Sequence, residues 1–170
     1  MPNWAEGNLR IRGKNENIVE FLQEELVWCA YMPGLDVKEF PVIVDIDEYG
    51  SIEIQKPQEL CDEGSKLGEP YLYIKDTRRN FVDLVDELWI NPDNDTSTLF
   101  ISGFRAAWSC HYEPYLEKAL KHNVDIKIVV YERGMEFHQI IEIVGGKLIR
   151  DDCIEYSDFE WECEFPHMGG

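Results

Sequence analysis

FRAAWSCHYEPYLEKALKHNVDIKIVVYERGMEF, residues Phe104–Phe137, is the stretch that decides the fold. Thr98–Phe104 leads into it with β-branched and aromatic residues, which predicts a strand. Pro114 stands near the start of a helix, where a missing N–H costs no hydrogen bond. Asn123 ends that helix, and Val124–Tyr131 then alternates apolar and polar residues as a strand does. The stretch therefore predicts a strand, a helix and a second strand in unbroken order.

The predicted helix has one apolar face and a basic last turn. Tyr112, Leu116, Ala119 and Leu120 follow helical spacing, so we expect them to face the sheet. The last turn contains Lys118, Lys121 and His122, and positive charge suits a helix C-terminus.

Two hairpins are predicted to follow the helix and its strand. Arg133-Gly134 supplies the first turn, and Met135–Val144 is the next strand. Gly145-Gly146 is a strong two-residue turn signal, after which Lys147–Arg150 returns.

The N-terminal part predicts another strand and helix. Asn8–Gly13 alternates as a strand, and Asn15 is a good residue to cap the following helix. Ile18, Phe21, Leu22 and Leu26 form its apolar stripe, and we expect the helix to end near 28–30, before Pro33-Gly34.

The middle of the chain predicts a hairpin, a short strand and a third helix. Phe40–Asp47 and Ile52–Gln55 are the two arms of the hairpin, and Lys56–Pro70 is a loop. Tyr71–Lys75 is a strand, and Thr77 is expected to cap a helix whose apolar residues are Phe81, Val85, Leu88 and Trp89.

Two motifs resemble a known family. The opening Met1-Pro2-Asn3-Trp4, followed by Leu9, Ile11 and Gly13, and the later "AAWS" and "YERGMEF" are similar to the YubB-like ferredoxin-like family of small phage and plasmid proteins. The chain departs from the family pattern at Ala5, where the family usually has Cys, at Gly7, where it has Asn, and at Cys110-His111, where it tends to have Pro-Pro. The resemblance covers residues 1–26 and 100–144. It implies a ferredoxin-like fold and a mobile-element origin, and it implies no catalytic residue.

These patterns together predict the fold class and the organisation of the chain. We expect an α+β protein in which ferredoxin-like β-α-β and β-α-β-β units form an antiparallel sheet with helices on one face. We expect one domain over residues 1–170. It divides into a first β-α unit (1–30), an inserted hairpin and helix (31–95), a second unit (96–150) and an acidic C-terminal strand and tail (151–170).

The composition is strongly acidic. Thirty-four Asp and Glu residues against 16 Lys and Arg residues give a net charge of −18. Such a field disfavours direct contact with nucleic acid or an anionic membrane, and it favours basic partners. Five cysteines without a CxxC pair, no signal peptide and no apolar run near about 20 residues predict a cytoplasmic protein with free thiols and no membrane span.

The most acidic stretch lies near the C-terminus. Residues 151–166 (DDCIEYSDFEWECEFP) contain seven acids and no base. From Asp158 onward, acidic and apolar residues alternate, which predicts a strand with carboxylates about 6.6 Å apart on one face. Successive phosphates along one DNA strand are about 3.4 Å apart, so the carboxylates would match every second phosphate.

The sequence offers only weak candidates for a catalytic, metal-binding or phosphate-binding site. Cys110-His111 has the elements of a nucleophile and a base, but neighbours in sequence point to different sides, so a packed cysteine is favoured. Glu136 and His138 would share a strand face, although the histidines show no metal-ligand spacing. The acidic run at residues 91–95 lacks the glycine and glutamate of a calcium loop and is read as a turn. Arg78-Arg79 has no glycine-rich phosphate loop beside it. We therefore expect no enzymatic activity, no catalytic residue, no metal and no cofactor.

The sequence thus predicts a non-enzymatic protein of a phage or plasmid that mimics nucleic acid. Its expected partner is a basic host protein that binds nucleic acid, such as a CRISPR effector or restriction nuclease. The expected contact residues are Glu155, Asp158, Glu160, Trp161, Glu162 and Glu164. The alternative is an accessory or structural protein of a mobile element that acts through protein contacts, including a homodimer through sheet edges. A further alternative is that the acidic face is only solvated and binds no partner.

Overall fold

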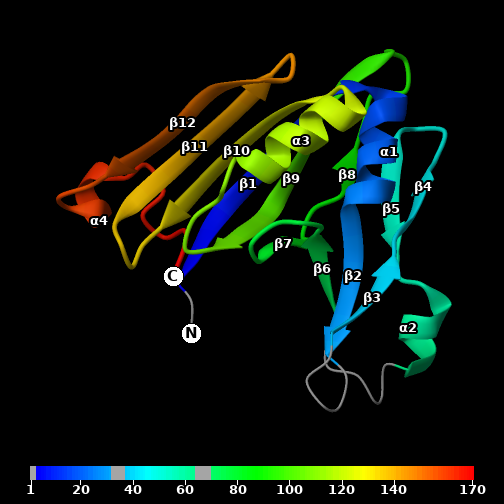
Figure 1. Ribbon diagram of the computed structural model, residues 1–170, viewed down its shortest axis with the longest axis horizontal. Helices are drawn as coiled ribbons and strands as arrows, with labels where there is room; N and C mark the ends of the chain where they lie inside the picture. Colours follow the sequence, from blue (N-terminus) through cyan, green and yellow to red (C-terminus); the bar gives the residue numbers. More distant parts are fainter. Residues whose placement is uncertain (1–2, 32–36, 64–69) are drawn as a thin grey trace.

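The computed structural model describes residues 3–31, 37–63 and 70–170 (Figure 1). Its helices are α1 (Asn15–Glu25), α2 (Gln58–Glu63), α3 (Glu113–His122) and α4 (Phe159–Glu162). Its strands are β1 (Trp4–Lys14), β2 (Leu26–Tyr31), β3 (Val37–Pro41), β4 (Ile43–Ile46), β5 (Ser51–Gln55), β6 (Tyr71–Ile74), β7 (Asn80–Asp83), β8 (Leu88–Trp89), β9 (Thr96–Ala107), β10 (Asp125–Glu132), β11 (Phe137–Val144) and β12 (Lys147–Glu155).

Most strands belong to one large antiparallel sheet. Its nine strands follow the order β12-β11-β10-β1-β9-β7-β6-β2-β3. A second sheet has the order β4-β5-β8 and packs into the same core as α1. The predicted class, an α+β protein built on antiparallel sheet, is confirmed.

The two longer helices, α1 and α3, lie on one face of the main sheet, as predicted (Figure 1). Alternate residues of the central strands point toward these helices, because successive side chains of a strand face opposite sides. Leu9 of β1, Ile101 of β9 and Ile128 of β10 are fully or almost fully buried in this way, against Phe21 of α1 and Tyr115 of α3. These contacts form the main hydrophobic core.

Helix α3 begins and ends where the sequence indicates, and it packs most of its predicted apolar face against the core. Asn123 closes it in the left-handed conformation, with φ of 50°. The buried residues of the helix are Tyr115, Lys118, Ala119 and His122, whereas Leu120 is 60% exposed. Of the predicted apolar face, Ala119 is buried and Tyr112 and Leu116 pack against the core, so only Leu120 was wrong. Lys118 and His122 are also buried, because both reach a buried carboxylate, Glu25, on α1.

The middle of the chain differs most from the prediction. No helix begins at Thr77; residues 80–83 and 88–89 are strands instead. Helix α1 ends at Glu25, and residues 26–31 form β2 rather than continuing the helix. The predicted strand over residues 40–47 is divided between β3 and β4, which belong to different sheets.

The segment predicted to be an insertion contributes β3, β6 and β7 to the main sheet and β4, β5 and β8 to the second sheet. Strands β6 and β7 lie between β2 and β9, and β3 lies at the edge beyond β2. The predicted hairpin of β4 and β5 and the predicted strand β6 are confirmed. Helix α2 occupies part of what was expected to be a loop. The predicted break at Pro33-Gly34 lies outside the described residues.

Gly7 permits a close approach between β1 and β10. A Cβ atom at this position would lie 1.9 Å from the carbonyl oxygen of Val129. Residue 7 pairs with Val130 on one side and Phe104 on the other, and a bulge follows it. A side chain here would push the two central strands apart, which explains why this chain has glycine at this position.

None of the helices in the described part of the chain combines the length and apolar character needed to cross a membrane.

Candidate partner-binding site

The acidic C-terminal stretch forms a short helix, α4, and not the predicted strand. Strand β12 ends at Glu155, and residues 159–162 are helical. Phe159 and Cys163 are both buried, so they occupy one side of a helical turn. The regular row of carboxylates at strand spacing is therefore wrong, and so is its match to every second DNA phosphate. Asp158 starts the helix, because its side chain accepts a hydrogen bond from the Trp161 N–H at 3.2 Å.

A second, smaller apolar cluster holds α4 against the sheet. Tyr131 of β10, Phe159 and Cys163 form its buried centre. Tyr131 pairs across the strands with His138 and stacks on its ring, with ring centroids 5.5 Å apart. This cluster lies on the sheet face opposite α1 and α3, since Tyr131 alternates with the core residue Val130.

His138 connects β11 to the segment that precedes α4. Its Nδ1 lies 2.6 Å from the Tyr156 hydroxyl. Burial lowers the pKa of His138, and the nearby Arg150 lowers it further, so at neutral pH the ring is uncharged and accepts the hydroxyl proton. Burial also raises the pKa of Tyr156 to about 12, which keeps that hydroxyl a donor. The hydrogen-bonded pair of His138 and Tyr156 beside α4 is therefore uncharged at neutral pH.

The carboxylates of residues 155–164 differ in the contacts they make. Asp158 caps α4, Glu162 accepts the Ser157 N–H at 3.0 Å, and Glu160 pairs with Arg133 at 2.8 Å. The carboxylates of Glu155 and Glu164 are exposed and make no hydrogen bond or ion pair with any described residue. The predicted site residues therefore come together at one end of the molecule, but only some of their charges are free.

Trp161 is the most exposed large hydrophobic residue described, with 86% of its surface accessible. It projects from the side of α4 opposite Phe159 and Cys163, so the cluster that anchors the helix also orients the indole. Fully exposed tryptophans are unusual, and tryptophan is enriched among residues that dominate protein interfaces. An indole held on a rigid turn among carboxylates is suited to protein recognition.

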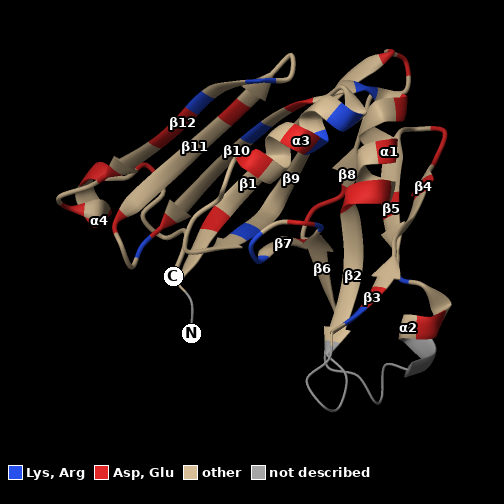
Figure 2. Cartoon of the chain, viewed as in Figure 1, with Lys and Arg blue, Asp and Glu red and all other residues tan. Residues whose placement is uncertain are grey.

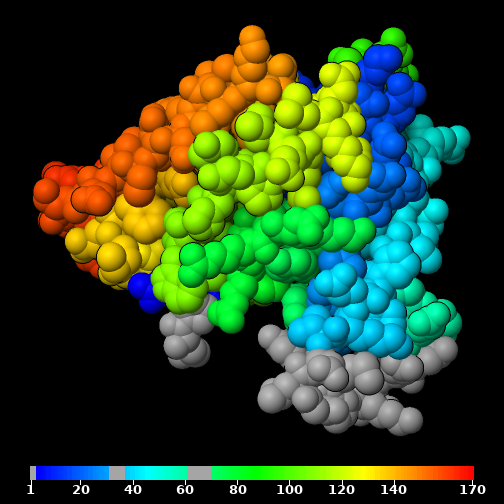
Figure 3. All heavy atoms as spheres, viewed as in Figure 1, coloured from blue at the N-terminus to red at the C-terminus, as the bar shows by residue number. Residues whose placement is uncertain are grey.

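Figure 2 shows that acidic residues gather at α4 and also at the distant hairpin of β4 and β5. In Figure 3 the C-terminal residues, coloured orange to red, form one end of the molecule. We call this end, comprising β12, α4 and the turn between β10 and β11, the acidic end. Its exposed acids are Glu136, Asp151, Asp152, Glu155, Asp158, Glu160, Glu162 and Glu164.

The β10–β11 turn contributes residues that the sequence did not identify. Arg133 reaches Glu160, Met135 is 67% exposed, and the Glu136 carbonyl accepts the Tyr156 N–H at 2.8 Å. The buried Glu132 carboxylate accepts the N–H groups of Gly134 and Met135 and thereby fixes this turn. No local pattern marks these contacts, because they depend on where α4 folds back.

The residues of the weaker candidate sites do not come together in the structure. Cys110 is buried and its thiol pKa is raised by burial, while its neighbour His111 is exposed, so they form no nucleophile–base pair. Glu136 lies in a turn before β11 begins at Phe137, and it does not share a strand face with His138. Asn91 accepts the Asp93 N–H at 3.0 Å, as expected of a turn.

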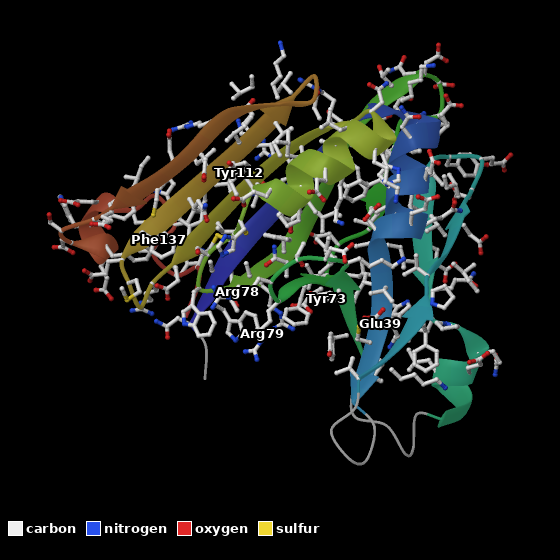
Figure 4. All side chains as sticks on the ribbon, in the orientation of Figure 1. Glu39, Tyr73, Arg78, Arg79, Tyr112 and Phe137 are labelled. Carbon is white, nitrogen blue, oxygen red and sulfur yellow. The ribbon has the colours of Figure 1, made fainter. Side chains whose placement is uncertain are left out.

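The basic pair Arg78-Arg79 lies between β6 and β7 and not at a helix start (Figure 4). Arg78 stacks over Trp108, with 5.1 Å from its guanidinium carbon to the ring centroid. Arg79 lines a pocket of about 840 Å³ together with Trp4, Phe81 and Arg105. The two arginines therefore point to different surroundings and form no shared phosphate site.

No family model, curated protein or solved structure matches the chain. The resemblance to the YubB-like family stays a prediction from the sequence, and function must be argued from the site itself.

Proposed function

We propose that the protein binds a basic, nucleic-acid-binding protein of the host through its acidic end and blocks that protein by occupying its nucleic-acid site. The observation that carries this proposal is the combination at α4 of an 86% exposed tryptophan with exposed carboxylates. The tryptophan supplies buried area in a complex, and the carboxylates take the place of phosphates. The role needs no reaction chemistry and is not enzymatic.

The net charge of −18 supports the same proposal. A protein with this field attracts a cationic groove and speeds association with it, and it repels free nucleic acid. The loss of the regular carboxylate row changes the kind of mimicry. The acidic end presents a compact cluster and an aromatic group, and it does not reproduce the spacing of a phosphate backbone. A target in a bacterial cell would be a nuclease of a CRISPR or restriction system, within the mobile-element origin that the sequence resemblance implies.

We further propose that the fold is a ferredoxin-like core with strands added to it. Strands β10, β1, β9 and β2 keep the order of such a core, and α1 and α3 provide its two crossovers on one face. Strands β6 and β7 separate β9 from β2, β11 and β12 extend one edge, and β3 extends the other. The acidic end is built on the added strands beyond β10, so it is an addition to that core.

The test is capture of proteins from a bacterial lysate on the immobilised chain at low and high salt. The proposal predicts that a basic nucleic-acid-binding protein is retained at low salt, released at high salt and lost with Trp161→Ala. Truncating an interface tryptophan typically costs about 2 kcal/mol or more, so the Kd should rise roughly 30-fold or more. Capture that is equal for wild type and Trp161→Ala would contradict the proposal.

A charge variant and its matched control sharpen this experiment. Glu155→Gln with Glu164→Gln removes two carboxylates that have no partner among the described residues of the acidic end. Glu48→Gln with Glu53→Gln removes two exposed carboxylates at the β4–β5 hairpin, far from α4 in Figure 1. Binding should weaken about threefold or more only for the first pair, since each rim charge contributes up to about 1 kcal/mol.

A second function is favoured by one separate observation, the open edge of the main sheet. Strand β12 is one of the two edge strands of the main sheet, and Ile149 on it is 61% exposed. An exposed edge strand with apolar side chains is a template for pairing with another strand. It supports the alternative of an accessory protein that forms a homodimer through β12.

Ile149→Lys tests this alternative. If β12 pairs with its copy, wild type should behave as a dimer in light scattering at micromolar concentration, and the lysine variant as a monomer. A wild-type monomer under the same conditions removes the homodimer and leaves the acidic end as the interaction site.

A further inference from the structure

A group of buried charged side chains lies where α1 and α3 pack against each other. The Glu25 carboxylate on α1 accepts from Lys118 Nζ at 2.7 Å, from Lys121 Nζ at 2.7 Å and from His122 Nε2 at 2.8 Å. Glu25, Lys118 and His122 are all almost completely buried. This carboxylate can only accept hydrogen bonds, so the His122 nitrogen that contacts it, Nε2, carries a proton.

The other nitrogen of His122 has no hydrogen-bond partner. With Nε2–H directed at Glu25, a neutral ring has a lone pair on Nδ1. Nδ1 makes no hydrogen bond, although His122 is only 3% exposed. It lies 4.0 Å from Glu20 Oε2. Two acceptors that face each other repel unless a cation stands between them. The arrangement therefore calls for a positive charge at Nδ1.

Two carboxylates complete a set of possible metal ligands. Glu20 and Glu24 are one helical turn apart on α1 and face His122. One ligand atom from each of Glu20, Glu24 and His122 lies within 4.8 Å of the others. We propose that these three residues bind a divalent transition-metal ion of the Zn²⁺ class, with Glu25 orienting the imidazole from behind.

The chemistry of the set suits Zn²⁺. Imidazole and carboxylate are both common zinc ligands, at about 2.0–2.2 Å from the metal. Histidine ligands almost always donate their second N–H to a carboxylate or carbonyl, and Glu25 is in that position. Three protein ligands leave the fourth tetrahedral position for water. A site of this kind would join α1 to α3 and hold a polarised water at the surface.

Binding requires only small movements of exposed side chains. The ligand atoms lie within 4.8 Å of one another and must close to about 3.3 Å, the separation that tetrahedral bonds of about 2 Å produce. The Glu20 and Glu24 side chains are about half exposed, so they can rotate. Lys121 pairs with Glu24 at 3.0 Å and must release it, but it keeps Glu25 at 2.7 Å. This site lies on α1 and α3 and is independent of the function proposed for α4.

The test is titration of the metal-free protein with Zn²⁺, followed by calorimetry and by the thermal unfolding midpoint. All variants carry Cys153→Ser, because that exposed thiol would itself bind zinc. We expect one equivalent of Zn²⁺ to bind and to raise the midpoint, since an ion that binds only the folded state stabilises it. Glu20→Gln with Glu24→Gln should weaken binding at least about tenfold and abolish the rise in the midpoint.

The matched control is Glu113→Gln with Glu117→Gln, two exposed carboxylates one turn apart on α3 that lie outside the group of possible metal ligands. It should bind Zn²⁺ as the wild type does. Equal binding by both double variants, or no binding by the wild type, would overturn the proposal.

Nitrogen NMR of the His122 ring gives a readout that does not need His122 to be replaced. The proposal predicts one protonated nitrogen in the metal-free protein and a large Zn²⁺-induced shift of Nδ1. A ring protonated on both nitrogens and unchanged by Zn²⁺ would show that a proton supplies the positive charge, and would overturn it.

Discussion

Glu25 is the residue on which the packing of α1 against α3 depends most. Burial alone would raise the pKa of its carboxyl group, but hydrogen bonds from Lys118, Lys121 and His122 outweigh burial and lower that pKa from 4.5 to about 2. A group whose pKa is lowered on folding stabilises the protein above its unfolded pKa. That stabilisation is lost as the pH falls from about 4.5 toward about 2.

The resulting prediction concerns Glu25→Gln. At neutral pH the variant should lose about 3 kcal/mol of unfolding free energy, because Lys118 stays buried without its counter-charge. As the pH falls to about 2, the difference from the wild type should vanish, since the wild-type carboxyl is then protonated too. Urea unfolding of both proteins at several pH values measures this; a difference that is constant with pH would contradict it.

The same residue shows why some side-chain positions could not be predicted. Helical spacing assigned Leu120 to the buried face of α3, but Leu120 is exposed and Lys118 and His122 are buried in its place. Their burial depends on a carboxylate at residue 25, on another helix. Periodicity measures apolar character along one element and is blind to an ionic partner that folding brings from elsewhere.

Among the elements, the central strands and α3 were predictable and α4 was not. β9, β10, β11 and the glycine turn after β11 follow patterns of residues that are local in the chain. Residues 158–164 alternate apolar and acidic residues, yet Phe159 and Cys163 also satisfy the spacing of one helical turn. Both side chains pack in one buried cluster with Tyr131, and this packing favours the helix over the strand. Residues 80–89 were misread for the same reason, because pairing of β7 with β9 outweighs helical periodicity.

The capping role of Asp158 leads to a prediction at this level. Asp158→Ala removes the acceptor of the Trp161 N–H and should lower stability by about 1 kcal/mol. It should also weaken partner binding, because α4 then holds Trp161 less firmly. Glu164→Ala, which removes an exposed carboxylate without a described partner, should leave the urea midpoint unchanged. Equal midpoints for Asp158→Ala and wild type would show that the cap does not hold α4.

In the whole molecule, acidic residues lie on most elements, and α4 and the β4–β5 hairpin are two of the places where they gather (Figure 2). Central strand residues such as Arg12 and Lys127 are paired with Asp125 and Glu142 on neighbouring strands. At the acidic end acids outnumber bases, and much of the net charge of −18 is spread over other elements. Composition predicted this acidity correctly, but only the fold places α4, the β10–β11 turn and β12 at one end.

The most direct measurement of nucleic-acid mimicry is competition between duplex DNA and this protein for the captured partner. If the acidic end occupies the nucleic-acid site, rising DNA concentration should displace the protein and its apparent Kd should increase in proportion. Trp161→Ala should be displaced at lower DNA concentration, and Glu48→Gln with Glu53→Gln should match the wild type. A ternary complex of partner, DNA and protein would contradict the account, because both ligands would then be bound at separate sites.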